Sequence, residues 1–227
     1  MTRSTSARVA GPPAGVVEVW VVALAARELA YDALTAPLDQ EERHHAQRMR
    51  VGGREWAATR GARRMILAGY LGLPPAALRF TRTATGKPRL TGTTGLEFSL
   101  ARTDGLAVLA VASDRAVGVD VERENDRTDI EVVAREFLSP VDIAVIARAA
   151  AENRRSAFFA AWARHEARLK LRGHGLGERS SEPAPEPEQL VVVRALATRP
   201  GFAAAVAAEG GSWTVRIRDF TLPGIGA

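Results

Sequence analysis

The spacing of apolar and polar positions along the chain changes from helical to strand-like and back. Apolar residues recur at helical spacing across 41–71, where arginines occupy the other faces and Gly72 follows as a stop signal. Segments 96–100 and 106–112 alternate or run apolar around a short polar turn, which is typical of a two-stranded hairpin. A long helix followed by a pair of strands is therefore predicted.

A further strand is predicted over 117–122, where valine alternates with glycine or an acid. Because strand side chains alternate between faces, the valines share one face, while Asp120 and Glu122 share the other. Three helices are expected next, over 130–137, 141–151 and 154–172, and then three strands, over 190–197, 202–208 and 213–220. This order of elements predicts an α+β fold with two similarly built halves.

The same pattern divides the chain into a disordered leader at 1–15, an N-terminal half at 16–112 and a C-terminal half at 113–227. A stretch rich in proline and glutamate, 178–189, cannot bury apolar area and is predicted to be a flexible loop of the C-terminal half. The longest apolar run, 16–26, is well short of the roughly 20 residues that a membrane-spanning helix needs. A membrane partner is therefore not expected.

Composition narrows the possible function classes. The chain has no cysteine, which excludes disulfides, thiolate zinc sites and a cysteine nucleophile and favours a cytoplasmic location. Its net charge of +5 predicts acidic or phosphorylated partners. Blocks of lysine and arginine interleaved with aromatic residues are missing from the sequence, so nucleic acid is not an expected partner.

Asp120 and Glu122 are the first candidates for chemistry. On a strand their α-carbons lie about 7 Å apart, so both carboxylates can reach one cation. Two bare carboxylates this close repel each other unless a cation or an arginine neutralises them. The pair is therefore either part of a metal site or an exposed strand end that pairs with Arg115 or Arg123.

The predicted helix over 154–172 places Trp162, Glu166 and Lys170 four residues apart, so these side chains stack along one side of the helix. Glu166 and Lys170 form either a simple ion pair between successive turns or a functional pair. In a functional pair the carboxylate binds a metal and the ammonium binds a phosphate. Spacing alone leaves both readings open.

Four motifs occur in an order and at a spacing that one enzyme family shares. They are GKP at 86–88, FSLART at 98–103, GVDVE at 118–122 and WARHEARLK at 162–170. Arg60 and Arg64 match an arginine pair on the first helix of the same family, and 202–208 matches its C-terminal strand. With these motifs the chain resembles the Sfp-type 4'-phosphopantetheinyl transferase family over nearly its whole length.

The resemblance implies two α/β halves related by a pseudo-twofold axis, with the active site in the cleft between them. It implies Mg²⁺-dependent transfer of the 4'-phosphopantetheine group from coenzyme A to a serine of an acyl or peptidyl carrier protein, with release of 3',5'-ADP. Such carriers are acidic around the modified serine, which suits the basic balance of this chain. A monomer is expected from the family.

The resemblance also assigns site residues. The Mg²⁺ ligands would be Asp120, Glu122 and Glu166. The catalytic groups would be Glu166, Lys170 and His165. Coenzyme A would be bound by Arg60, Arg64, Lys87, Arg102 and Lys170.

Two departures from the family pattern leave an alternative open. Ala101-Arg102 stands where the family usually has Ser-His, and His165 stands where it usually has lysine. Arg102 can replace the contact of a histidine to the 3'-phosphate. His165 is mostly neutral near pH 7, so it attracts phosphate less than lysine does but can act as a base. The alternative is a repurposed relative with altered chemistry, or a non-catalytic module that binds coenzyme A or a carrier protein.

Overall fold

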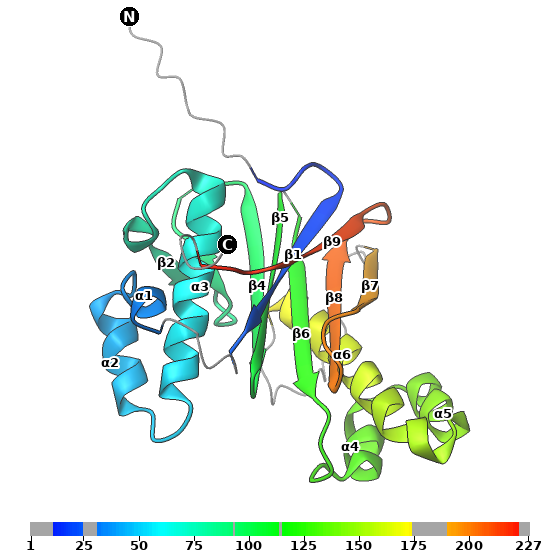
Figure 1. Ribbon diagram of the computed structural model, residues 1–227. Coiled ribbons are helices and arrows are strands. Elements are labelled where there is room, and N and C mark those ends of the chain that lie inside the picture. Colours follow the sequence, from blue (N-terminus) through cyan, green and yellow to red (C-terminus); the bar gives the residue numbers. More distant parts are fainter. Residues whose placement is uncertain (1–10, 25–30, 93, 114, 174–189, 223–227) are drawn as a thin grey trace, which may run out of the picture.

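Figure 1 shows the computed structural model of the chain, which describes residues 11–24, 31–92, 94–113, 115–173 and 190–222. The first ten residues of the predicted leader and the predicted loop at 178–189 lie outside the described residues. Residues 11–15 of the predicted leader belong to the described part and contact the fold. Pro12 is buried, and its carbonyl accepts a hydrogen bond from Ser113 Oγ at 2.9 Å.

Two sheets form the centre of the molecule. The first has the strand order β4-β5-β1-β9, formed by Leu96–Thr103, Leu106–Ser113, Val16–Ala23 and Thr214–Asp219. The second has the order β6-β8-β7, formed by Val117–Arg123, Phe202–Glu209 and Val191–Leu196. A small hairpin pairs β2, Phe80–Arg82, with β3, Pro88–Leu90. The strands predicted from alternation are confirmed, whereas the short β2–β3 pair has too few residues to show a period.

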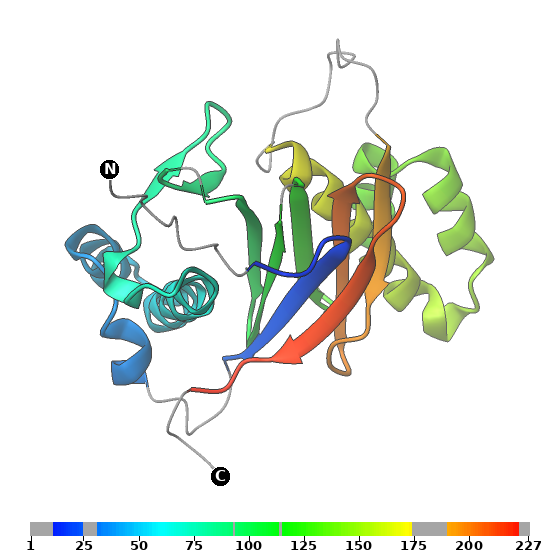
Figure 2. The same cartoon turned by 90° about the horizontal axis from the view of Figure 1, so that it is seen from above.

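Helices cover the outer faces of both sheets (Figures 1 and 2). On one side lie α1, α2 and α3, which span Tyr31–Thr35, Gln40–Arg48 and Gly53–Leu71. On the other side lie α4, α5 and α6, which span Ile130–Phe137, Pro140–Arg148 and Arg154–Arg172. Short 3₁₀ turns occur at Pro75–Ala77 and Ala151–Asn153. Mixed helices and sheets of this kind confirm the α+β class. Within the described part of the chain, no helix is both long and apolar enough to cross a membrane.

The main core lies between the two sheets. Valines of β1 and β6 meet apolar residues of β5 and β8 there, and Val117, Val119 and Val121 are at most 2% exposed. The valine face predicted for 117–122 is therefore confirmed. Residues of β5 on the opposite face pack against α3, and Ala205 and Ala207 of β8 pack against α6. The layers thus run helix, sheet, sheet, helix.

The last strand closes the first sheet. β9 pairs in parallel with β1, so that Val16 lies opposite Thr214. Glu18, buried on β1, accepts hydrogen bonds from Arg216 and Arg218 of β9 at 3.0 Å each and also from the hydroxyl of Tyr70 on α3. One buried carboxylate therefore ties the C-terminal strand, the first strand and α3 together, and its arginine partners supply the charge that its burial requires.

The single helix predicted over 41–71 is wrong in one respect, because the segment forms two helices. Gly52 adopts a left-handed conformation, with φ 73°, and separates α2 from α3. A Cβ on Gly53 would lie 2.3 Å from the carbonyl oxygen of Ala46, so glycine is needed where the two helices approach. α2 is almost wholly polar and buries none of its residues, so its sequence has no apolar period that could show where it ends. The predicted stop at Gly72 is confirmed.

A second close approach positions the functional residues. A Cβ on Gly118 of β6 would lie 2.1 Å from the carbonyl oxygen of Ala167 and 2.3 Å from the backbone nitrogen of Leu171, both on α6. Only glycine lets the strand and helix backbones touch in this way. Residues 120 and 122, which share the strand face of Gly118, are consequently held directly beside α6.

Replacing Gly118 by alanine is expected to push α6 away from β6. Backbone atoms cannot yield as a flexible side chain does, so we expect the free energy of unfolding to fall by about 1–3 kcal/mol. Gly69→Ala on α3 is the matched control, since its added Cβ meets no atom within 4 Å. Helix propensity should make that control neutral or slightly stabilising. Urea unfolding of both variants tests this, and equal stability of the two variants would contradict the close approach.

Candidate active site

Asp120 and Glu166 are two buried acids on neighbouring elements. Asp120 lies on β6 and is 3% exposed, and Glu166 lies on α6 and is 4% exposed. The ammonium of Lys170, one helical turn beyond Glu166, donates to Asp120 Oδ1 at 2.5 Å. The other carboxylate oxygen of Asp120 is buried and has no hydrogen-bond partner within the described residues. A buried carboxylate oxygen without a partner is costly, and a cation bound at this oxygen would remove that cost.

Glu122 completes the acidic group. The indole Nε1 of Trp162, on α6, donates to Glu122 Oε1 at 3.2 Å. Burial and then the charge of Asp120 raise the pKa of Glu122 to about 7. The same two causes raise the pKa of Glu166. The three acids are therefore close enough to disfavour one another's charge, as expected for carboxylates that share one cation.

In their observed conformations the side chains of the three acids are not arranged as a metal-binding site. In the part of the chain that is described, no three Asp, Glu, His or Cys side chains are grouped so that they could hold a metal ion as they stand. Lys170 and Trp162 instead engage the carboxylates of Asp120 and Glu122. The donor set nevertheless fits Mg²⁺, because all donors are carboxylate oxygens and one of them, Asp120 Oδ2, has no partner among the residues that the structure describes.

A cleft of about 240 Å³ lies beside this acidic group. It brings together three of the predicted coenzyme A residues, namely Arg60 of α3, Lys87 of the β2–β3 hairpin and Lys170 of α6. The remaining lining residues are Arg82, Thr85, Gly86, Pro88, Phe98, Ser99, Leu100 and Gly173. The cleft is thus formed by both helical sides of the molecule and by the edge strand β4.

Lys87 has a second role in this cleft. Its ammonium donates to the carbonyl of Val117 at 2.8 Å and to that of Leu171 at 3.3 Å. Burial lowers its pKa. These bonds attach the GKP turn to β6 and to the end of α6, so Lys87 both lines the cleft and fixes one of its walls.

Arg60 lines the cleft, whereas Arg102 does not line it but lies close enough for its charge to act on Arg60. The guanidinium of Arg60 is 4.9 Å from the ring centroid of Trp56, a cation–π contact that restrains its position. Burial lowers the pKa of Arg60, and the charges of Arg82 and Arg102 lower it further. Arg102 forms an ion pair with Glu55 at 3.2 Å.

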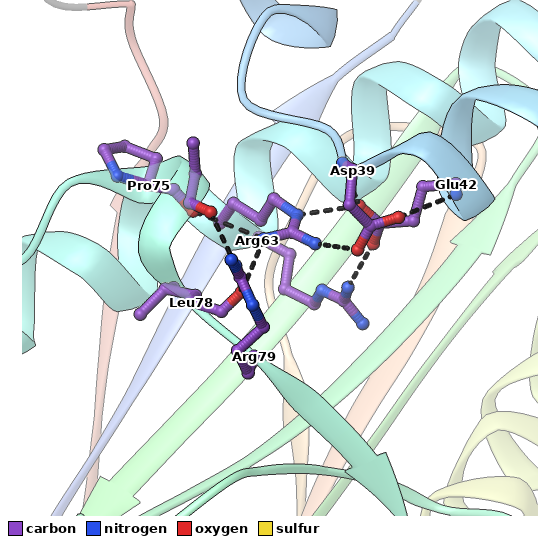
Figure 3. Close-up of polar contacts among 8 residues, drawn as sticks. Asp39, Glu42, Arg63, Pro75, Leu78 and Arg79 are labelled. Atoms are coloured by element: carbon purple, nitrogen blue, oxygen red, sulfur yellow. Dashed lines mark hydrogen bonds and ion pairs between the residues drawn. The ribbon is translucent and has the colours of Figure 1, made fainter.

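Arg64 belongs to a polar cluster with Asp39 and Glu42. Figure 3 shows the surroundings of this cluster, with Arg63, Pro75 and Leu78 labelled beside the two acids. Arg64 is 0% exposed and does not line the cleft. Its guanidinium pairs with Asp39 at 2.5 Å and with Glu42 at 2.7 Å and also donates to the carbonyls of Pro75 and Leu78. These contacts attach α2 and the 3₁₀ turn to α3, so they give Arg64 a structural role.

His165 faces a different neighbour from Glu166. Burial and the charge of Arg168 lower its pKa, while Asp142 of α5 opposes that shift. Its ring lies 5.7 Å from that of Trp162. The structure therefore places His165 on the α5 side of α6, beside Trp162, and not among the groups that contact Asp120.

Sequence reasoning missed Trp56, Arg82 and the hydrogen bond from Val119 N to Ser99 Oγ at 3.1 Å. The bond to Ser99 joins β4 to β6 and so fixes the cleft edge. Two signals were available: Trp56 lies one helical turn before Arg60, and Arg82 lies on the strand before the GKP turn. Neither residue belongs to a motif.

Glu122→Gln is expected to stabilise the metal-free protein in a pH-dependent way. The folded-state pKa of Glu122, about 7, exceeds its ordinary value of 4.5, so ionisation as pH rises between these values weakens folding. In EDTA at about pH 8 the variant should be more stable by about 1–2 kcal/mol, or roughly 2–8 °C in unfolding temperature. The gain should shrink toward pH 5. A loss of stability in Glu122→Gln, or a gain that does not depend on pH, would contradict the conclusion that burial and the charge of Asp120 disfavour the ionised form of Glu122.

The stabilities of Arg64→Met and Arg60→Gln should distinguish an arginine that holds the fold together from one that is available for a ligand. Removing the buried Arg64 charge leaves Asp39 and Glu42 short of a partner, so unfolding free energy should fall by about 3 kcal/mol. Arg60 forms no ion pair with a carboxylate in the described residues, so Arg60→Gln should change stability by less than about 1 kcal/mol. Urea unfolding measures both. A larger loss for Arg60→Gln would reverse the two assignments.

The comparisons with known proteins agree with this geometry. A family model described as the 4'-phosphopantetheinyl transferase superfamily matches residues 116–215, which include Asp120, Glu166 and Lys170. The chain is similar to the 4'-phosphopantetheinyl transferase HetI of Nostoc sp., at 32% identity over 71% of this chain and 70% of that protein. It is also similar to the L-aminoadipate-semialdehyde dehydrogenase-phosphopantetheinyl transferase of Eremothecium gossypii, at 31% identity over 57% of this chain and 49% of the relative. The chain is therefore a transferase and belongs to the 4'-phosphopantetheinyl transferase superfamily.

Proposed function

We propose that this chain transfers the 4'-phosphopantetheine group of coenzyme A to a serine of an acyl or peptidyl carrier protein, with Mg²⁺, and releases 3',5'-ADP. One observation carries the proposal: the acids Asp120, Glu122 and Glu166 are mutually coupled beside a cleft lined by Arg60, Lys87 and Lys170. Acids that hold a cation next to bases that hold phosphates suit a reaction at a phosphoryl group.

Asp120, Glu122 and Glu166 would hold Mg²⁺, and one ligand atom would be Asp120 Oδ2, which has no hydrogen-bond partner in the described part of the chain. When bound, the ion supplies neutralisation of the charge that develops on the pyrophosphate. Trp162 restrains Glu122 through its indole hydrogen bond. The fixed approach of β6 to α6 at Gly118 keeps the acids in register with Lys170.

The serine hydroxyl would attack the β-phosphate of coenzyme A. Lys170 and Lys87 would bind phosphate oxygens and hold the pyrophosphate for in-line displacement. The Glu166 carboxylate, whose pKa is raised, is the proposed acceptor of the serine proton. His165 is the other candidate base, because its lowered pKa keeps the ring neutral and able to accept a proton.

Further parts of the proposal rest on the family and on charge. The halves at 16–112 and 113–227 would be related by a pseudo-twofold axis, and the enzyme would act as a monomer in the cytoplasm. Its net charge of +5 would attract a carrier that is acidic around the serine. Polyketide and nonribosomal peptide carriers are the proposed class of partner.

One observation favours the alternative of a repurposed relative that binds coenzyme A or a carrier without transfer. His165 stands where the family usually has lysine, and it faces Arg168 and Asp142 rather than Asp120. A relative of this kind would bind coenzyme A and leave carriers unmodified.

The test incubates the protein with Mg²⁺, coenzyme A and a panel of apo carrier proteins, and then measures each carrier by intact mass. Wild type should add one phosphopantetheine group, and EDTA should stop the addition. Asp120→Asn should lower the rate at least about 100-fold while leaving the fold intact, because the site loses charge that the transition state needs. Asp104→Asn, an exposed acid on the β4–β5 turn, is the matched control and should match wild type.

Three outcomes are decisive. A full rate for Asp120→Asn would remove the metal assignment. Coenzyme A binding by wild type without addition to any carrier would favour the repurposed relative. Addition that persists in EDTA would contradict the role of Mg²⁺.

A further inference from the structure

Another cavity lies between α3 and β9, the strand at the open edge of the first sheet (Figure 2). Its volume is about 380 Å³, and most of its wall is apolar, formed by Trp20, Met65, Ile66 and Phe220. The described residues that line it are all different from those that line the cleft beside the acids. Cavities of about 300–1,000 Å³ with apolar walls and a few polar groups are typical of small-molecule sites. This cavity is therefore a candidate binding site separate from the cleft.

The polar part of the lining belongs to a charged group. Glu18 lines the cavity and is 3% exposed, and its carboxylate accepts hydrogen bonds from Arg216 and Arg218 at 3.0 Å each and from the hydroxyl of Tyr70. Burial would raise the pKa of Glu18, but the hydrogen bonds from these three residues outweigh burial and lower its pKa. The carboxylate is therefore ionised at neutral pH. It balances one of the two guanidinium charges, so the group as a whole is positive.

Arg218 is the member of this group that a ligand can reach. Its side chain lines the cavity, is 42% exposed and, within the described residues, pairs with no carboxylate other than Glu18. In this part of the chain it donates only through Nη2, so its other nitrogens still have N–H groups for a ligand. The guanidinium lies 5.4 Å from the ring centroid of Trp20, a cation–π contact that restrains its position. A restrained guanidinium with unused donors can bind an anion at a small cost in conformational entropy.

The apolar part of the cavity has room for the body of a ligand. Gly69 of α3 lines the cavity, and a Cβ added there would meet no atom within 4 Å. The indole Nε1 of Trp20 donates to the hydroxyl of Tyr70 at 2.8 Å, so the polar atom of the indole is satisfied and its ring carbons are left for apolar contact. Trp20, Met65 and Phe220 are only partly buried, so an apolar ligand would remove more of their surface from water.

We propose that this cavity binds a small organic carboxylate, whose charged head group pairs with Arg218 while its apolar body packs against Trp20, Met65 and Phe220. The positive balance of the charged group disfavours a cationic ligand. A neutral apolar ligand would cover the guanidinium of Arg218 without pairing it, which costs free energy. A multiply charged phosphate would place its further charges against apolar walls. The site is independent of the proposed transfer reaction, because it shares no described residue with the cleft.

The experiment titrates the whole protein with octanoate, octanol and octylamine, which share an apolar body and differ in the charge of the head group. The chain has three methionines, so NMR of the methionine methyl groups can follow Met65, whose signal is assigned with Met65→Leu. Octanoate should move the Met65 signal to saturation. Octanol should bind at least roughly tenfold more weakly, because it lacks the charge-assisted contact. Octylamine should leave the signal unchanged.

Arg218→Gln tests the charged contact. It should bind octanoate no more tightly than octanol, while its affinity for octanol stays that of wild type. Glu18 keeps its hydrogen bond from Arg216 in this variant, so the fold should remain. Arg199→Gln is the matched control, because it removes the same charge from a residue that pairs with Asp219 of β9 at 3.1 Å but lies outside the cavity. This control should bind octanoate as wild type does.

Gly69→Leu tests the cavity without changing any charge. The variant should fold, because its side chain enters open space and leucine favours a helix, and it should lose the binding of both octanoate and octanol. Equal affinity of wild type for octanoate and octanol, or wild-type affinity for octanoate in Arg218→Gln, would overturn the proposal. A shift of the Met65 signal by octanoate that persists in Gly69→Leu would place the ligand elsewhere and also overturn it, as would a Met65 signal that octanoate does not move in wild type.

Discussion

The contact between β6 and α6 is the constraint on which the site depends. Gly118 lets the strand backbone lie against the helix backbone, so that Asp120 comes beside Glu166 and Lys170. Both acids are buried there, and burial disfavours their charge. A larger side chain at Gly118 would relieve this crowding but separate Asp120 of β6 from Glu166 and Lys170 of α6. The buried charges of the two acids therefore lower the stability of the fold, and a cation beside them offsets this loss.

Two cations can meet that requirement. Lys170 does so in the structure through its short bond to Asp120, while the second oxygen of that carboxylate has no partner within the described residues. Under the proposed function Mg²⁺ would take this place, and the Lys170 ammonium would then be available for a phosphate. Because Lys170 is tethered one turn from Glu166, such an exchange needs rotation of a side chain and no movement of the helix.

Sequence patterns identified the residues that chemistry requires and missed those that position them. The period of two over 117–122 separated the valines from Asp120 because each residue's face depends only on local alternation. Arg64 matched the motif position equally well, yet its neighbours Asp39 and Glu42 come from another helix and bury it. Periodicity carries no information on such contacts across the fold. The break at Gly52 was missed because α2 buries none of its residues, so no apolar spacing marks its end.

The most direct test of this account is the effect of Mg²⁺ on thermal unfolding at about pH 8, with coenzyme A present. Mg²⁺ is expected to raise the unfolding temperature of wild type, because an ion that binds only the folded state stabilises it. Glu166→Gln, which removes one of the coupled charges, should lose most of that increase. An unfolding temperature that does not respond to Mg²⁺ in wild type, or an equal response in Glu166→Gln, would contradict the claim that the buried acids form a cation site.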